Sequence, residues 1–182
     1  MLFDGFVQES AASGALCARF SPLLPPALTA VWQKYGFGTV LDGYLKVVNP
    51  EDYQDLLQDT YALGGEAIPI FATAFADLIT WEKGRYIRMV KYREGVFQGV
   101  AAGFDFFWED VESGAFDARF FDLELYQAAV RRWGPLQFGQ CFCFVPLLGL
   151  GGRKEADCLR KGNIKEQIEL IRQFFGRVGD DL

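Results

Sequence analysis

Residues 68–100 of this 182-residue chain read IPIFATAFADLITWEKGRYIRMVKYREGVFQGV, and their pattern predicts the central part of its fold. Four segments of this stretch are rich in β-branched and aromatic residues, which favour strands. They are 68–73, 78–82, 85–92 and 96–100. Short turns that contain glycine, EKG at 82–84 and REG at 93–95, separate the last three segments. Because tight turns join antiparallel neighbours, the stretch predicts an antiparallel meander.

Helical and extended patterns flank this meander on both sides. Apolar residues recur every three or four positions in four segments, which is the spacing of one helix face. These segments are 28–35, 53–61, 123–133 and 164–175. Two further segments, 39–48 and 137–145, read as extended. The order of elements predicts a mixed α/β (α+β) fold with a largely antiparallel central sheet flanked by about four helices.

The composition excludes several classes of protein. Apolar residues make up 51% of the chain and charged residues 23%, which is too apolar for intrinsic disorder. No apolar run approaches the roughly 20 residues of a membrane span, so we expect no membrane contact. The first ten residues carry Asp4 and Glu9 and no basic cluster, which argues against a signal peptide and for a cytoplasmic location.

The charge balance indicates a protein partner. Lys and Arg total 18 against 24 Asp and Glu, a formal net charge of −6. Because binding to DNA requires clustered cations, we expect no direct contact with nucleic acid. An acidic chain is better suited to a basic protein surface. Basic residues gather only at 83–93, where we expect a solvated edge of the sheet.

The absence of histidine is the sharpest chemical fact in the sequence. It excludes the nucleophile–His pairs and the His metal ligands, and no set of a nucleophile, a base and an orienting group replaces them. We therefore expect no enzymatic activity, no catalytic residue, no metal and no cofactor. The four cysteines contain no CxxC pair. Cys141 and Cys143 share one face if they lie on a strand, and we interpret them as small buried apolar side chains, with a redox or metal role as the alternative.

A glycine-rich loop leaves a second function open. Residues 148–154 read LGLGGRK, and backbone amides of such a loop can hold an anion. The spacing fits neither of the two common phosphate-binding motifs, so a plain turn is favoured. The alternative function is a small-ligand or nucleotide-sensing regulatory module that uses Gly149–Gly152 with Arg153 and Lys154.

Acidic residues supply the candidate contacts for a partner. Seven acids lie within 105–124 against one arginine, and a tryptophan stands among them as a possible interface anchor. The candidates for partner binding are Asp105, Trp108, Glu109, Asp110, Glu112 and Asp117, with Asp42 and Glu51 in reserve.

Two regions carry a resemblance to known families. Trp32, Gly36–Gly38 and the run LDGYLKVVNP at 41–50, continued by IPIFATAFADL at 68–78, resemble the GAD-like domain of bacterial proteins. The segment from Phe138 through FVPLLGLGG at 144–152 is similar to the domain that follows it in type VI secretion immunity proteins of the Tdi type. We therefore expect an N-terminal segment at 1–20, a GAD-like part at 20–103 and an immunity-type part at 104–182, packed as one unit.

The resemblance implies a function in bacterial competition. Such an immunity protein stays in the cytoplasm of the producing cell and binds a cognate toxin domain, typically a DNase. It would neutralise the toxin by blocking the DNA-binding cleft or by distorting the toxin fold. The acidic balance, the absence of histidine and the lack of a catalytic set agree with this expectation.

Overall fold

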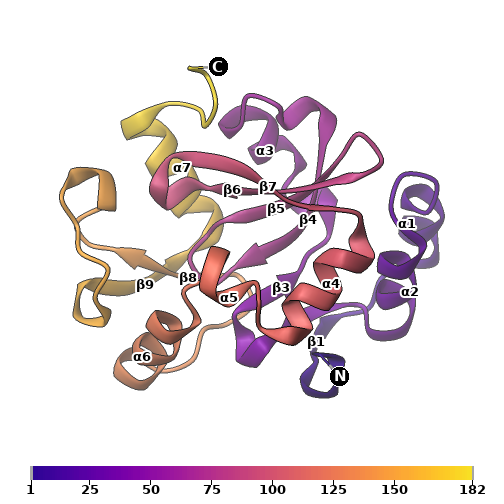
Figure 1. The fold of residues 1–182 in the computed structure, drawn as a ribbon, viewed down its shortest axis with the longest axis horizontal. Helices are drawn as coiled ribbons and strands as arrows, with labels where there is room; N and C mark the ends of the chain where they lie inside the picture. The colour runs from indigo at the N-terminus through magenta and orange to yellow at the C-terminus, as the bar shows by residue number, and fades with distance from the viewer. Residues whose placement is uncertain (1, 182) are drawn as a thin grey trace.

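The computed structural model of the chain describes residues 2–181. Within them a seven-stranded sheet runs in sequence order from β1 to β7, and each neighbouring pair is antiparallel (Figure 1). The strands are β1 (Val7–Ser10), β2 (Phe37–Val40), β3 (Leu45–Val47), β4 (Ala67–Thr73), β5 (Leu78–Glu82), β6 (Tyr86–Lys91) and β7 (Val96–Ala102). The predicted meander is confirmed, and it extends to β1 at one end.

Helices and a small second sheet complete the mixed fold. The second sheet pairs β8 (Gln140–Phe144) with β9 (Leu159–Asn163). The helices are α1 (Gly14–Phe20), α2 (Pro26–Tyr35), α3 (Gln54–Thr60), α4 (Phe104–Ser113), α5 (Asp117–Phe120), α6 (Leu123–Trp133) and α7 (Ile164–Phe175). The four helices predicted from spacing correspond to α2, α3, α6 and α7. The structure adds α1, α4 and α5, so the predicted fold class is confirmed with more helices than expected.

The sheet is buried on both faces by helices. Phe71 of β4 packs in one core cluster with Trp32 of α2 and Phe107 of α4. Its neighbour in the strand, Ala72, packs in the other cluster with Leu57 of α3 and with residues of α7. Because successive strand residues point to opposite faces, these two clusters mark the two sides of the sheet. The helix α4 therefore lies on the face opposite to α3 and α7.

The N-terminal segment that we set apart at 1–20 takes part in this fold. Its strand β1 pairs with β2, and Leu16 and Cys17 of α1 are buried in the core. Ser13 caps α1 by accepting a hydrogen bond from the amide of Leu16 at 3.1 Å. The segment contributes the edge strand next to β2.

The expectation of a solvated sheet edge at 83–93 is wrong. Strand β6 lies between β5 and β7, so its alternate side chains point into the packed layers. Arg88 meets Glu82 at 3.0 Å, and Arg93, just beyond the strand, meets Asp77 at 2.8 Å. The turn at 83–85 and the first strand residue, Tyr86, stay exposed. A buried cation requires a paired carboxylate, and Asp77 provides one for the buried Arg93, while the half-buried Arg88 is paired with Glu82.

Arg93 also joins the two halves of the chain. Its Nη1 donates to Asp122 at 2.7 Å while its Nε donates to Asp77 at 2.8 Å. Lys154 extends this network with ion pairs to Asp122 at 3.7 Å and to Glu94 at 2.6 Å. Burial raises the pKa of Asp77 to about 6, against the opposing effect of the Arg93 charge. Arg93 thus forms a buried ion pair within the meander and a partly buried one with the C-terminal half.

Candidate functional site

Helix α4 presents the largest group of predicted contact residues. Phe104, Phe107 and Val111 are spaced i, i+3 and i+7, and all three are buried in the core under the helix. Gly114 ends the helix in the left-handed conformation at φ 78°, which favours glycine. The spacing of the three apolar residues was the signal for this helix. It was missed because aromatic residues stand between them.

The opposite face of α4 is acidic and exposed. Asp105, Glu109 and Glu112 are spaced i, i+4 and i+7, so they form one row on the solvent side. Phe106 lies beside this row with 65% of its surface exposed. We call Asp105, Phe106, Glu109 and Glu112 the α4 surface. An exposed aromatic ring next to polar residues is the arrangement of an interface anchor with a polar rim.

Trp108, the predicted anchor, lies on the other side of the helix. It is half-buried, and its ring stacks on Phe3 at 4.7 Å and on Phe104 at 5.5 Å between centroids. It also lies 6.2 Å from Phe71 of β4. Trp108 therefore packs α4 against the sheet and the N-terminal residues, and Phe106 is the aromatic residue that α4 exposes.

Asp110 and Asp117 shape the chain after α4. The carbonyl of Asp110 accepts from the amide of Phe116 at 3.2 Å, which closes the turn. The Asp117 carboxylate accepts from the amide of Leu123 at 2.8 Å, at the first residue of α6. Asp117 also borders a hollow of about 570 Å³ together with Asp122 and Glu124. The acidic character of α4 thus continues to the start of α6.

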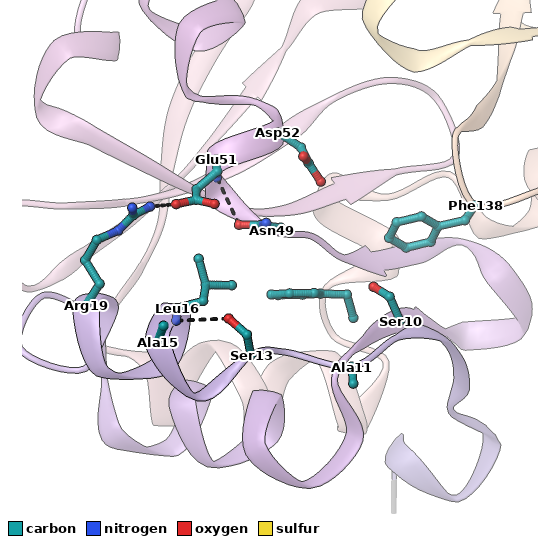
Figure 2. A pocket seen from close by; sticks show the side chains of 11 residues that line it. Ser10, Ala11, Ser13, Ala15, Leu16, Arg19, Asn49, Glu51, Asp52 and Phe138 are labelled. Atoms are coloured by element: carbon teal, nitrogen blue, oxygen red, sulfur yellow. Dashed lines mark hydrogen bonds and ion pairs between the residues drawn. The ribbon is translucent and has the colours of Figure 1, made fainter.

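The two reserve residues lie elsewhere. Asp42 is exposed in the turn between β2 and β3, and its carbonyl accepts from the Tyr126 hydroxyl at 2.7 Å. Glu51 forms an ion pair with Arg19 at the rim of a hollow of about 480 Å³ (Figure 2). In Figure 2 this pair stands at one end of the hollow and Phe138 at the other. Because no α4 residue lines this hollow, Glu51 belongs to a different surface.

The glycine-rich loop is a packed turn. A Cβ at Gly149 would come within 2.5 Å of the Phe175 ring, and a Cβ at Gly152 would come within 2.0 Å of the Pro146 carbonyl oxygen, so the loop packs closely on its neighbours. Lys154 is held by Glu94 and Asp122, and Arg153 faces Glu155 at 3.4 Å. The elements that follow the loop are a single 3₁₀ turn at Ala156–Cys158 and then β9. The loop therefore does not lead into an α-helix, as a phosphate-binding loop requires.

The end of α7 carries an exposed apolar surface that the sequence did not indicate. Phe174 is 57% exposed and Phe175 48% exposed, and Leu150 of the neighbouring loop is 51% exposed. Phe175 borders a hollow of about 420 Å³ that also includes Tyr92 and Ile171. Exposed apolar groups of this kind are more typical of interaction surfaces than of monomer surfaces.

One buried charged side chain lies on strand β3. Lys46 is 1% exposed, and its Nζ donates to the carbonyl of Gln137 at 3.1 Å. Burial lowers the pKa of Lys46 to about 8. Within residues 2–181, no three or more Cys, Asp or Glu side chains are placed to hold a metal ion together. The same part of the chain includes no helix of sufficient length and apolarity to cross a bilayer.

Two family models match consecutive parts of the chain. The family described as GAD-like domain matches residues 3–93, which is half of the chain. The family described as T6SS immunity protein Tdi1, C-terminal, matches residues 101–175. All of α4 lies within the second match.

The fold is similar to that of a solved structure titled crystal structure of Atu4351 from Agrobacterium tumefaciens. The two superpose with a TM-score of 0.71 and 17% sequence identity, over 94% of this chain and 86% of that chain. At this identity the likeness shows the fold alone. No curated protein matches the sequence.

Proposed function

Because this chain belongs to the GAD-like domain family and its residues 101–175 match the family of the T6SS immunity protein Tdi1 C-terminal domain, we propose that it binds and neutralises a cognate DNase toxin of the producing bacterium. The family expected from the sequence is confirmed by both matches. The nuclease partner, the docking surface and the cytoplasmic site of action belong to the proposal.

The electrostatics of the chain supports a nuclease partner. A DNase must bind the phosphate backbone, so its cleft carries Lys and Arg. This chain has a formal net charge of −6, and the α4 surface places three carboxylates in one row. Opposite charges steer two proteins into contact and raise the association rate, with less effect on the dissociation rate. The acidic row would occupy the positions that DNA phosphates take.

We choose α4 as the docking surface because of the side chains that this helix exposes. Phe106 is 65% exposed beside the acidic row, so the helix offers an apolar anchor with a charged rim. Phe104 and Phe107 hold α4 on the core, which presents this surface without a large ordering cost. We therefore favour occlusion of the nuclease cleft by α4 over distortion of the toxin fold. Neutralisation then needs occupancy and no chemical step.

Charge reversal with a matched control tests the docking surface. The test variant carries Asp105→Lys, Glu109→Lys and Glu112→Lys on α4. The control variant carries Asp55→Lys, Asp59→Lys and Glu66→Lys, three exposed acids at α3 and the turn that follows it. Each set moves the formal net charge from −6 to 0, so the two variants differ only in where the charge changes.

The proposal predicts different outcomes for the two variants. Association with the purified nuclease should slow at least about tenfold for the α4 variant at low salt, with loss of protection of co-expressing cells. The α3 control should still protect the cells, and its association rate should fall only by the part that depends on net charge. Equal effects of the two variants on association and protection, with both melting normally, would exclude α4 as the docking surface.

A further inference from the structure

Strand β7 forms an open edge of the seven-stranded sheet. It pairs with β6 on one side and, within residues 2–181, with no strand on the other. Apart from this pairing, the backbone of Val96–Ala102 forms no hydrogen bond with any other described part of the chain. None of its seven residues is buried, whereas all five residues of β5 are. The outward N–H and C=O groups of β7 are therefore free to bond another strand.

The sequence of β7 lacks the features that usually protect such an edge. It reads VFQGVAA, with no charged residue and no proline, and its seven residues exceed the typical strand length of about 5–6. The register shift opposite Ile87 and Arg88 leaves Val96–Gly99 in regular pairing with β6. The other edge strand, β1, has four residues, carries Glu9 and pairs irregularly with β2. Of the two edges, β7 is thus the better template for an added strand.

Strand β7 leads directly into the α4 surface. Gly103 is the single residue between the strand and the helix. A Cβ at Gly103 would lie 3.5 Å from the Phe106 ring, so this exposed ring stands at the end of the strand. Asp105 is also exposed, one residue before Phe106. A chain that runs along the edge of β7 therefore reaches the α4 surface.

We propose that the cognate toxin adds an extended segment to β7 as an eighth strand of the sheet, with a basic residue of that segment beside Asp105. This inference rests on the proposed function and names the backbone part of the same interface. Main-chain hydrogen bonds along an edge supply affinity, and neighbouring side chains supply specificity. The carboxylates of the α4 surface favour a basic segment, and β7 itself has no charge that opposes one.

The charge of the chain favours the toxin over a second copy as the occupant of this edge. Pairing of two β7 edges would bring together two chains that each carry a formal net charge of −6. It would also bring two acidic α4 surfaces near each other, because α4 begins directly after the strand. Like charges disfavour such an association, whereas a basic nuclease is attracted.

Hydrogen exchange of single backbone amides tests the added strand. Exchange is measured by NMR on the isotopically labelled full-length chain, alone and with an excess of catalytically inactive toxin domain. The outward amides of β7 should exchange quickly in the free chain and at least about tenfold more slowly in the complex. The outward amides of β1 serve as the internal control and should keep their rates. Calorimetry under the same conditions reports whether the toxin binds.

The possible outcomes separate this inference from the proposed function. Toxin binding with unchanged exchange along β7 would overturn the inference and leave the proposed function intact. Equal slowing at β1 and β7 would also overturn it, since general stabilisation of the sheet would then explain the effect. Slow exchange along β7 without toxin that increases with chain concentration would assign the edge to a second copy and exclude the toxin segment. Absence of any toxin binding would contradict the proposed function itself.

Discussion

Replacement of Arg93 by methionine probes the ionic contact between the two halves of the chain. Arg93 is buried, with Nε 2.8 Å from Asp77 and Nη1 2.7 Å from Asp122. Its guanidinium lies 4.6 Å above the Phe75 ring. Methionine keeps much of the apolar stem and its contact with this ring but removes the charge and the donors. The variant therefore isolates the ionic part of the contact.

The expected magnitude follows from the burial of Asp77. Asp77 is completely buried, whereas Asp122 is half-buried and keeps Lys154 as a partner. Removal of one partner from a buried pair typically costs about 3–5 kcal/mol of unfolding free energy. Burial already raises the pKa of Asp77 to about 6 with Arg93 present, so without Arg93 the pKa rises further. Protonation of Asp77 then keeps the loss of unfolding free energy near the lower end of this range.

The pH dependence has a definite sign. The folded-state pKa of Asp77 lies above its unfolded value of 3.8, so the folded chain holds a proton that the unfolded chain has lost. The energetic cost of the ionised Asp77 therefore grows as pH rises through this interval. In Arg93→Met the folded-state pKa of Asp77 is higher than in the parent, so this pH interval extends to higher pH. We expect the destabilisation relative to the parent to be smaller at about pH 5 than at about pH 8.

Urea unfolding followed by circular dichroism measures these differences. The double variant Arg93→Met/Asp77→Asn removes the unpaired carboxylate and should recover part of the loss at about pH 8. Asp77→Asn alone serves as the control for the effect of the asparagine side chain on the free energy of unfolding. A loss below about 1 kcal/mol in Arg93→Met, or a double variant as unstable as the sum of the two single variants, would refute the coupling between these residues.

Two further substitutions test other parts of the account. Burial lowers the pKa of Lys46 from its ordinary value of 10.5 to about 8. Between these two pH values the unfolded chain keeps a proton on Lys46 that the folded chain has lost. As pH rises through this range, the free energy of unfolding of the parent should increase by up to about 3 kcal/mol relative to that of Lys46→Met. A difference between parent and variant that stays constant with pH in urea unfolding would contradict this. Phe106→Ala should weaken toxin binding by about 2 kcal/mol or more with an unchanged melting temperature, as measured by calorimetry. Phe174→Ala, on the exposed surface of α7, is its control.

The meander and the long helices could be predicted because their patterns are local. The glycine turns and apolar segments of 68–100 correspond to β4–β7, and helical spacing located α6 and α7. Strand β9 could not be predicted, because its sequence LRKGN has one apolar residue. Its extended conformation depends on its pairing with β8. The short helix α1 depends in the same way on burial of Leu16 and Cys17.

The candidate surface shows a similar limit. The sequence identified the acids of α4 and indicated Trp108 as the anchor, but it did not indicate Phe106, because both stand among aromatic and acidic neighbours. The distinction depends on which face of the helix meets Phe3 and Phe71, and these contacts are distant in sequence. The burial of Arg93 was hidden for the same reason, since its partners lie 16 and 29 residues away.

Titration of nuclease activity with this chain measures neutralisation of the toxin itself. DNA cleavage by a fixed amount of the cognate toxin domain is measured against increasing amounts of the purified chain. Occupancy of the cleft predicts a linear fall in activity that ends at one chain per toxin, and full recovery when excess inactive toxin captures the chain. Undiminished cleavage at molar excess, or irreversible inactivation by substoichiometric chain, would contradict the account.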